Sequence, residues 1–274
     1  MALATIAALA AAVLHATWNL VAKRAGDPFL AIWGQFLIAG CLALPCVVVL
    51  GGLPVGAWGW ATLSGVVHLP YLTGLAYAYR HGDFSLAYPI ARGGGALVAA
   101  AGGLLLLGDD LGVLAVLAIC VVVAGLVGLS GGAPRTQVLV AVWVAVTVGS
   151  YTTVDSHAIR SYPGVTYVFV VFVMIAVVLT AWGLAVGRGR DLRALPRDAW
   201  RRMTLTAAMS MVTYGLVLFA AQRAAVGYVA ALRESSVLIA SVMGARVLGE
   251  HRGRARQVAS GLVVAGLVLL VSAQ

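Results

Sequence analysis

The segment LAYPIARGGGALVAAAGGLLLLGDD, residues 86–110, places one arginine, Arg92, in a run of alanine, leucine, valine and glycine that has no other charge before its closing acid pair. The segment VAALRESSVLIASVMGARVLGEH, residues 229–251, has nearly the same plan. Its Arg233 precedes a glycine and an acid by sixteen residues, as Arg92 does. Two segments of one design in a single chain predict an internal repeat.

The composition around these segments is that of a membrane protein. Hydrophobic residues make up 62% of the 274 residues and charged residues only 10%, whereas soluble chains carry about a quarter charged residues. Between the charge clusters lie apolar segments of roughly twenty residues, the length with which a helix crosses about 30 Å of hydrocarbon. We predict an all-α integral membrane protein with ten transmembrane helices, near 2–22, 28–50, 57–79, 84–107, 111–130, 137–158, 164–187, 203–222, 226–248 and 257–273.

The net charge of +9 is distributed unevenly between the predicted loops. Even-numbered loops hold two basic residues, Arg160 and Arg223, and odd-numbered loops hold thirteen: Lys23, Arg24, Arg80, Arg135, Arg188, Arg190, Arg193, Arg197, Arg201, Arg202, Arg252, Arg254 and Arg256. By the positive-inside rule the odd loops are cytoplasmic, which predicts that both termini lie outside. The excess of basic residues is therefore explained by the orientation of the chain in the membrane. It does not indicate a nucleic acid partner, and none is expected.

The repeat extends to both halves of the chain. Matching positions are Tyr71 with Tyr214, Arg80 with Arg223, and Arg92 with Arg233. Each repeat then holds five helices, and an odd number of helices inserts the second copy in the opposite orientation. We predict two inverted repeats, residues 1–132 and 133–274. Such halves can exchange conformations and open one central site alternately to each side of the membrane, which indicates transport.

Ten helices in two inverted halves, each closing its fourth helix with Leu-Gly-Asp or Leu-Gly-Glu, resemble the drug/metabolite transporter superfamily, in particular its members with paired EamA domains. The resemblance covers residues 4–130 and 137–272. It implies a ten-helix bundle in which the fourth and ninth helices, with parts of the first, third, sixth and eighth, line a central cavity. Members export amino acids and other metabolites or exchange nucleotide sugars, so the resemblance implies a class of protein but no substrate.

The two intramembrane arginines are the first candidates for binding a solute. Arg92 could reach the cytoplasmic headgroups, but a charge exposed to lipid costs at least about 2.5 kcal/mol, which favours the bundle interior or a cavity. The three glycines that follow it are expected to let a neighbouring helix approach. Arg233 is placed similarly in the second half. The adjacent Glu234 is predicted to be either a protonation site or a structural partner of Arg92.

Polar and aromatic side chains on other helices complete the predicted substrate-binding set: His15, Trp18, Asn19, His68, Tyr71, Tyr88, Tyr151, Asp155 and Tyr214. Asn19 needs a partner in hydrocarbon, on another helix or in the cavity. His68 has a structural alternative as a satisfied core histidine. Asp155 lies near the outer end of its helix, where a solvated interfacial role is the alternative.

Other classes of protein are poorly supported. The three cysteines lie in apolar spans without metal-ligand spacing, and the chain has no H-E-x-x-H and no Walker motif, so no metal or cofactor is expected. Residues 128–131 read Gly-Leu-Ser-Gly and match the G-x-S-G of rhomboid intramembrane proteases, with Ser130 as nucleophile, but a glycine-rich helix end gives the same letters. A membrane scaffold without transport is a further alternative.

These observations predict a secondary transporter in a plasma membrane that exports a small polar organic metabolite by alternating access and is not an enzyme. Two arginines favour a solute with a carboxylate or phosphate, such as a zwitterionic amino acid. Proton coupling or facilitated exchange would drive it. The alternative within transport is an exporter of lipophilic cations, which would use Glu234 or Asp155 with aromatic side chains. The expected partners are the solute and the lipid bilayer.

Overall fold

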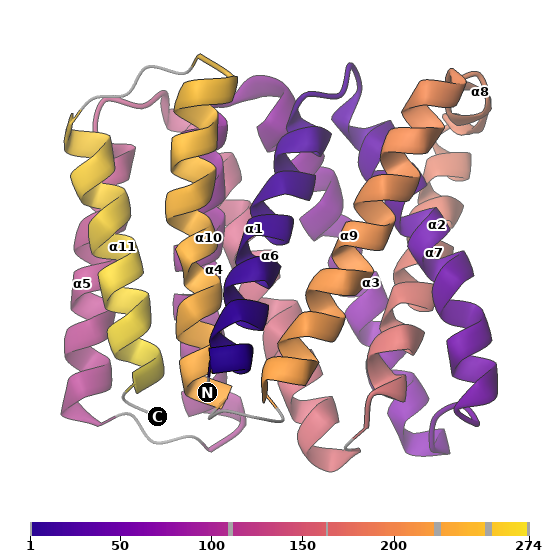
Figure 1. The fold of residues 1–274 in the computed structure, drawn as a ribbon, viewed down its shortest axis with the longest axis horizontal. Coiled ribbons are helices and arrows are strands. Elements are labelled where there is room, and N and C mark those ends of the chain that lie inside the picture. Colours follow the sequence, from indigo (N-terminus) through magenta and orange to yellow (C-terminus); the bar gives the residue numbers. More distant parts are fainter. Residues whose placement is uncertain (1, 109–111, 163, 222–225, 250–253, 273–274) are drawn as a thin grey trace.

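The computed structural model of the protein describes residues 2–108, 112–162, 164–221, 226–249 and 254–272 (Figure 1). The regular structure of these residues is entirely helical. Their eleven helices are α1 (Ala2–Lys23), α2 (Pro28–Val49), α3 (Val55–His81), α4 (Phe84–Leu106), α5 (Val113–Ser130), α6 (Arg135–Ser161), α7 (Thr166–Ala185), α8 (Gly189–Arg193), α9 (Arg197–Ala221), α10 (Val226–Val247) and α11 (Arg254–Ser272).

Each of the ten predicted spans corresponds to one long helix, and α8 is an additional helix of five residues. Six helices, α1, α2, α4, α5, α6 and α7, are long and apolar enough to cross a membrane, and shorter apolar stretches lie in α10 and α11. The chain is therefore a multi-pass membrane protein. The largest difference from prediction is the start of α9, at Arg197 instead of residue 203. Its first turn carries Asp198, which a helix N-terminus favours, so the helix begins before the apolar run does.

The ten long helices form one elongated bundle (Figure 1). The pair α5 and α11 lies at one edge and the pair α2 and α7 at the other, with the remaining long helices between them. Both chain ends lie at one end of the bundle and α8 lies at the opposite end. Successive long helices alternate in direction, so that the first and sixth, or the fifth and tenth, run antiparallel.

Most helix contacts in the first half of the chain have a counterpart in the second. Helix α4 packs on α6 as α10 packs on α1, and α3 packs on α6 and α7 as α9 packs on α1 and α2. The pairs α4 with α5 and α10 with α11 also correspond. The remaining close pairs, α2 with α7, α4 with α10 and α5 with α11, join equivalent helices of the two halves.

The contact between α5 and α11 shows this correspondence at atomic detail. A Cβ atom on Gly125 would lie 2.7 Å from the backbone nitrogen of Val263, and one on Gly266 would lie 2.7 Å from the backbone nitrogen of Val122. The two glycines differ by 266 − 125 = 141 positions and the two valines by 263 − 122 = 141, the offset that also relates the two membrane arginines. Each helix thus offers the other the same glycine surface.

The glycines that follow Arg92 serve the packing of α4, as expected. A Cβ atom on Gly94 would lie 2.8 Å from the Cβ of Ala145 in α6, and α6 in turn offers Gly149 to the backbone of α4, where an added Cβ would lie 2.9 Å from the nitrogen of Ala99. Close approach of backbones lets two helices gain dispersion contacts that lipid cannot replace. These glycines therefore hold α4, and with it Arg92, against α6.

Candidate functional site

A cavity of about 460 Å³ lies in the middle of the bundle, among α1, α2, α3, α4, α6, α7, α9 and α10. Most of its surface is apolar and aromatic, with a small number of polar side chains, as in sites for small organic molecules. Nine of the twelve residues predicted from the sequence line it: His15, Trp18, His68, Tyr71, Arg92, Tyr151, Asp155, Tyr214 and Arg233.

The two arginines enter the cavity from helices that run in opposite directions. Arg92 lies eight residues after the first residue of α4, and Arg233 lies seven residues after the first residue of α10. At 1.5 Å per residue they sit about 12 Å and about 10 Å from opposite ends of the bundle. Both guanidinium groups act electrostatically on His15 and on Tyr151. The cavity therefore has a positive region to which both halves of the chain contribute.

His15 has its hydrogen-bonding capacity fixed by its own helix. The indole nitrogen of Trp18 donates to Nδ1 of His15 at 3.3 Å, and the two rings meet edge to face with centroids 5.3 Å apart. Neutral His15 then carries its proton on Nε2 and is a donor there. Tyr88 does not line the cavity but packs against the His15 ring, with centroids 6.1 Å apart. Its ring also packs against that of Phe84, with centroids 5.3 Å apart.

His68 on α3 has the opposite arrangement. Its Nδ1 lies 2.7 Å from the backbone oxygen of Ser64, which only accepts, so Nδ1 donates and Nε2 of the neutral ring is an acceptor. The ring stacks on Tyr151 with centroids 4.0 Å apart, and Tyr71 meets it edge to face at 5.8 Å. The two cavity histidines thus offer a solute one donor and one acceptor.

Asp155 lines the cavity from α6 and accepts a hydrogen bond from the hydroxyl of Tyr167 at 2.9 Å. Tyr167, in the first turn of α7, also lines the cavity and was not among the residues predicted from the sequence. The Ser64 side chain also hydrogen-bonds the Asp155 carboxylate, so two groups hold it at the side of the cavity. Asp155 is the acidic group that the described residues contribute to the lining.

Besides Tyr88, two predicted site residues are not part of the described cavity lining, Asn19 and Glu234. The amide nitrogen of Asn19 donates to the backbone oxygen of His15 at 2.8 Å, and its oxygen accepts from the hydroxyl of Tyr79 at 2.6 Å. The structure therefore places Asn19 between α1 and α3, away from the cavity lining. Glu234 belongs to α10, but its side chain lies outside what the structure describes, so neither of its predicted roles is tested.

Three polar residues of the lining were missed by sequence reasoning: Ser156, Ser210 and Thr213. Serine and threonine in membrane helices commonly bond their own backbone, so their presence alone does not indicate a site. The signal that could have found Ser210 and Thr213 is their spacing of four and one from Tyr214, which places all three on one face of α9.

Ser130 lies at the C-terminal end of α5, on the edge of the bundle (Figure 1). Its hydroxyl donates to the backbone oxygen of Val127 at 2.9 Å. This is the behaviour of a serine at a helix end. In the described ranges, no group of three or more His, Cys, Asp or Glu side chains is arranged to hold a metal ion.

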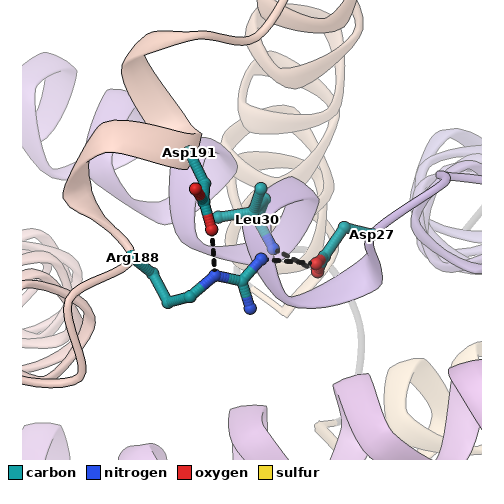
Figure 2. Close-up of polar contacts among 4 residues, drawn as sticks. All are labelled: Asp27, Leu30, Arg188 and Asp191. Atoms are coloured by element: carbon teal, nitrogen blue, oxygen red, sulfur yellow. Dashed lines mark hydrogen bonds and ion pairs between the residues drawn. The ribbon is translucent and has the colours of Figure 1, made fainter.

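A second polar cluster lies at the end of the bundle that carries α8 (Figure 2). Asp27 is the N-cap of α2 and accepts from the backbone nitrogen of Leu30 at 3.1 Å, ahead of Pro28 in the first turn. It also accepts from Nη2 of Arg188 at 2.7 Å, and Arg188 pairs through Nε with Asp191 in α8. Burial alone would raise the pKa of Asp27, but the hydrogen bonds from Arg188 and the backbone of Leu30 bring its pKa below the usual value.

Comparisons with known proteins agree with this architecture. The model of the EamA-like transporter family matches residues 135–272. A crystal structure of a protein aligns with 97% of this chain and 95% of its own, at a TM-score of 0.63 and 16% sequence identity, which shows a shared fold. The comparison with curated proteins found no match.

Proposed function

The chain belongs to the EamA-like transporter family, and from this membership we propose that it is a secondary transporter that moves a small organic metabolite with a carboxylate group, such as an amino acid, out of the cell by alternating access. The observation that carries this proposal is the central cavity, to which both halves of the chain contribute an arginine. An arginine binds a carboxylate through two parallel hydrogen bonds. The apolar and aromatic walls suit the body of such a solute.

The described lining also holds one carboxylate, Asp155, on α6. With Arg92 and Arg233 it gives the described part of the lining a mixed charge, in which two positive groups face one negative group. This balance favours an anion or a zwitterion whose ammonium group faces Asp155. Asp155 and His68 are also the groups through which a proton could be coupled to transport, since each can bind one.

The proposal includes ten membrane-spanning helices in two inverted repeats, residues 1–132 and 133–274. The paired helix contacts and the matching glycine surfaces of α5 and α11 support it. It places the chain in a plasma membrane with α8 in the cytoplasm and both termini outside, because α8 lies in one of the odd-numbered predicted loops, which together hold thirteen basic residues.

A second candidate is an exporter of lipophilic cations. The aromatic lining and the Tyr167-bound Asp155 are the observations that favour it. In that case the solute would depend on Asp155, and Arg92 and Arg233 would oppose binding. The two candidates therefore predict opposite contributions of Arg92 and Arg233 to binding: favourable for a carboxylate and unfavourable for a cation.

Ligand-dependent thermal stability of the detergent-purified protein distinguishes them. The test panel holds free amino acids and other small carboxylates, the amide of each carboxylate as its matched control, and tetraphenylphosphonium as a lipophilic cation. We expect stabilisation by at least one carboxylate and none by its amide. Stabilisation by tetraphenylphosphonium alone would contradict the proposal and support the cation exporter.

A further inference from the structure

A second cavity of about 360 Å³ lies at the end of the bundle that carries α8, between α1, α2 and α9. Its lining is largely apolar, with Asp27 and Arg202 as the charged members. The proposed site does not include it, and none of the residues that line one cavity lines the other.

The two cavities follow one another along the same helix faces. On α9 the second cavity is lined by Ala199, Arg202, Met203 and Thr206, and the central cavity by Ser210, Thr213, Tyr214 and Val217. Successive members are one, three or four residues apart, so they form one continuous stripe. On α1 the stripe His15, Trp18 and Ala22 passes from the central cavity to the second one in the same way.

One helical turn of packed side chains separates the cavities. Gln35 of α2 lines the second cavity, is 1% exposed, and donates from Nε2 to the hydroxyl of Ser210 at 2.7 Å. Ser210 lines the central cavity and donates to the backbone oxygen of Thr206 at 2.9 Å. Nearer the α8 end, Gly34 leaves room for the side chain of Met203, which lines the second cavity and packs α9 on α2.

We propose that the second cavity is the continuation of the solute path toward the α8 end, and that the Gln35–Ser210 hydrogen bond closes the path between the two cavities in this conformation. The inference rests on the proposed transport function. The barrier contains one hydrogen bond between neutral groups, with no ion pair between α2 and α9 at this level among the described residues. Such a contact is specific enough to define a closed state and weak enough to open.

The test measures access of a water-soluble reagent, independently of any solute. In a background with Cys41, Cys46 and Cys120 changed to serine, one cysteine is placed in the central cavity as Thr213→Cys and, in a separate protein, one in the second cavity as Ala199→Cys. A membrane-impermeant methanethiosulfonate with a sulfonate group is applied to right-side-out and to inverted membrane vesicles. The side from which Ala199→Cys reacts identifies the side to which the second cavity opens.

From that side we expect Thr213→Cys to react slowly, and Gln35→Ala or Ser210→Ala to accelerate the reaction roughly two- to tenfold, the range set by the loss of one neutral hydrogen bond. Ser210→Ala removes only a hydroxyl, so it keeps the test valid if Gln35→Ala is poorly folded. The matched control is Ser241→Ala, which removes a buried interhelical bond to Ser260 away from both cavities and should leave the rate unchanged.

Two results would overturn the inference. Ala199→Cys that reacts from neither side would show a lateral pocket closed to water, and Thr213→Cys with an unchanged rate in both polar variants would show that this bond is not the barrier. Failure of the transport proposal is distinguishable, because the labelling pattern would then be as expected while no carboxylate stabilises the protein.

Discussion

Arg92 carries a charge about 12 Å into α4, where a lipid-facing guanidinium would be costly. The structure turns it toward a cavity that also contains Arg233 and two histidines with fixed donor and acceptor atoms. Its place there suits recognition of an anionic group. The competing interpretation, a structural pair with Glu234, concerns a side chain that is not described.

Replacing Arg92 separates these interpretations. Arg92→Lys keeps the charge but loses the planar fork, so carboxylate binding should weaken by at least about tenfold while the protein folds normally. Arg92→Ala should abolish binding. Binding is measured by the ligand-dependent shift in thermal stability, and Arg246→Lys, an exposed arginine on α10 outside the cavity lining, is the matched control with unchanged binding.

If Arg92 is instead the structural partner of Glu234, Arg92→Ala leaves the partner charge unpaired at a cost of about 3–5 kcal/mol, and this protein should be poorly folded. The double variant Arg92→Leu with Glu234→Leu would then recover the stability of the original protein. A double variant that is stable and binds carboxylate with unchanged affinity would remove the recognition role of Arg92.

Asp27 gives a prediction outside the membrane-spanning segments. Because its pKa is lower in the folded protein than in the unfolded chain, its contribution to stability is fully present above the unfolded pKa of about 3.9 and is lost as the pH falls through the lower folded value. Asp27→Asn should therefore lower the melting temperature at pH 7. The difference from the original protein should shrink as the pH falls below about 4.

The control for Asp27 is Asp198→Asn. Asp198 pairs with Arg201 at 3.5 Å, and the two side chains are 76% and 81% exposed. Water screens such a pair, so this replacement should change the melting temperature little at either pH. Equal effects of the two replacements at pH 7 would show that the Asp27–Arg188 contact adds nothing specific.

At the scale of helices, hydropathy predicted the location of all ten long helices, because a span of apolar residues must satisfy its backbone internally in lipid. Hydropathy did not predict the helix boundaries correctly where charged residues lie inside a helix. The arginines at positions 201 and 202 ended the apolar run, yet α9 continues through them to Arg197, and α8 is too short and polar to leave a hydropathy signal. These features depend on helix ends and local hydrogen bonds, which composition does not report.

The matching glycines of α5 and α11 give a paired prediction. Gly125→Ala and Gly266→Ala should each lower stability, by about 1–3 kcal/mol as for overpacking, because the added methyl meets backbone atoms. The control Gly261→Ala, on the same helix α11, meets nothing within 4 Å and should be neutral or stabilising by up to about 1 kcal/mol. Thermal unfolding in detergent checks all three, and unequal effects at positions 125 and 266 would argue against equivalent surfaces.

The sequence predicted those residues of the candidate site whose side chains are rare in membrane-spanning helices. Charged and ring-bearing residues such as Arg92, His68 and Tyr214 stood out from their apolar surroundings and line the cavity. Asn19 stood out equally, but it accepts a hydrogen bond from Tyr79 between two helices. Whether such a residue lines the cavity or joins two helices depends on how α1 packs against α3, which the sequence does not show. Ser210 resembles serines that bond only their own helix, and its spacing of four residues from Tyr214 is the one sequence feature that points to the cavity.

For the whole molecule, the positive-inside rule predicts the orientation of the bundle. A cysteine at Ala194, next to α8, should be protected from a membrane-impermeant thiol reagent in intact cells, after the three native cysteines are removed. A cysteine at Val55, which is 91% exposed at the opposite end, should be labelled. The reverse labelling pattern would place the termini in the cytoplasm and refute the orientation derived from thirteen basic loop residues.

The central claim is that the cavity between the two halves carries a carboxylate solute across the membrane. The most direct test is uptake of the radiolabelled carboxylate that stabilises the protein best, into liposomes loaded with the same unlabelled compound. We predict saturable uptake by the original protein and by Arg246→Lys, and uptake no greater than that of empty liposomes by Arg92→Ala. Undiminished uptake by a folded Arg92→Ala protein, or no uptake by the original protein, would contradict the claim.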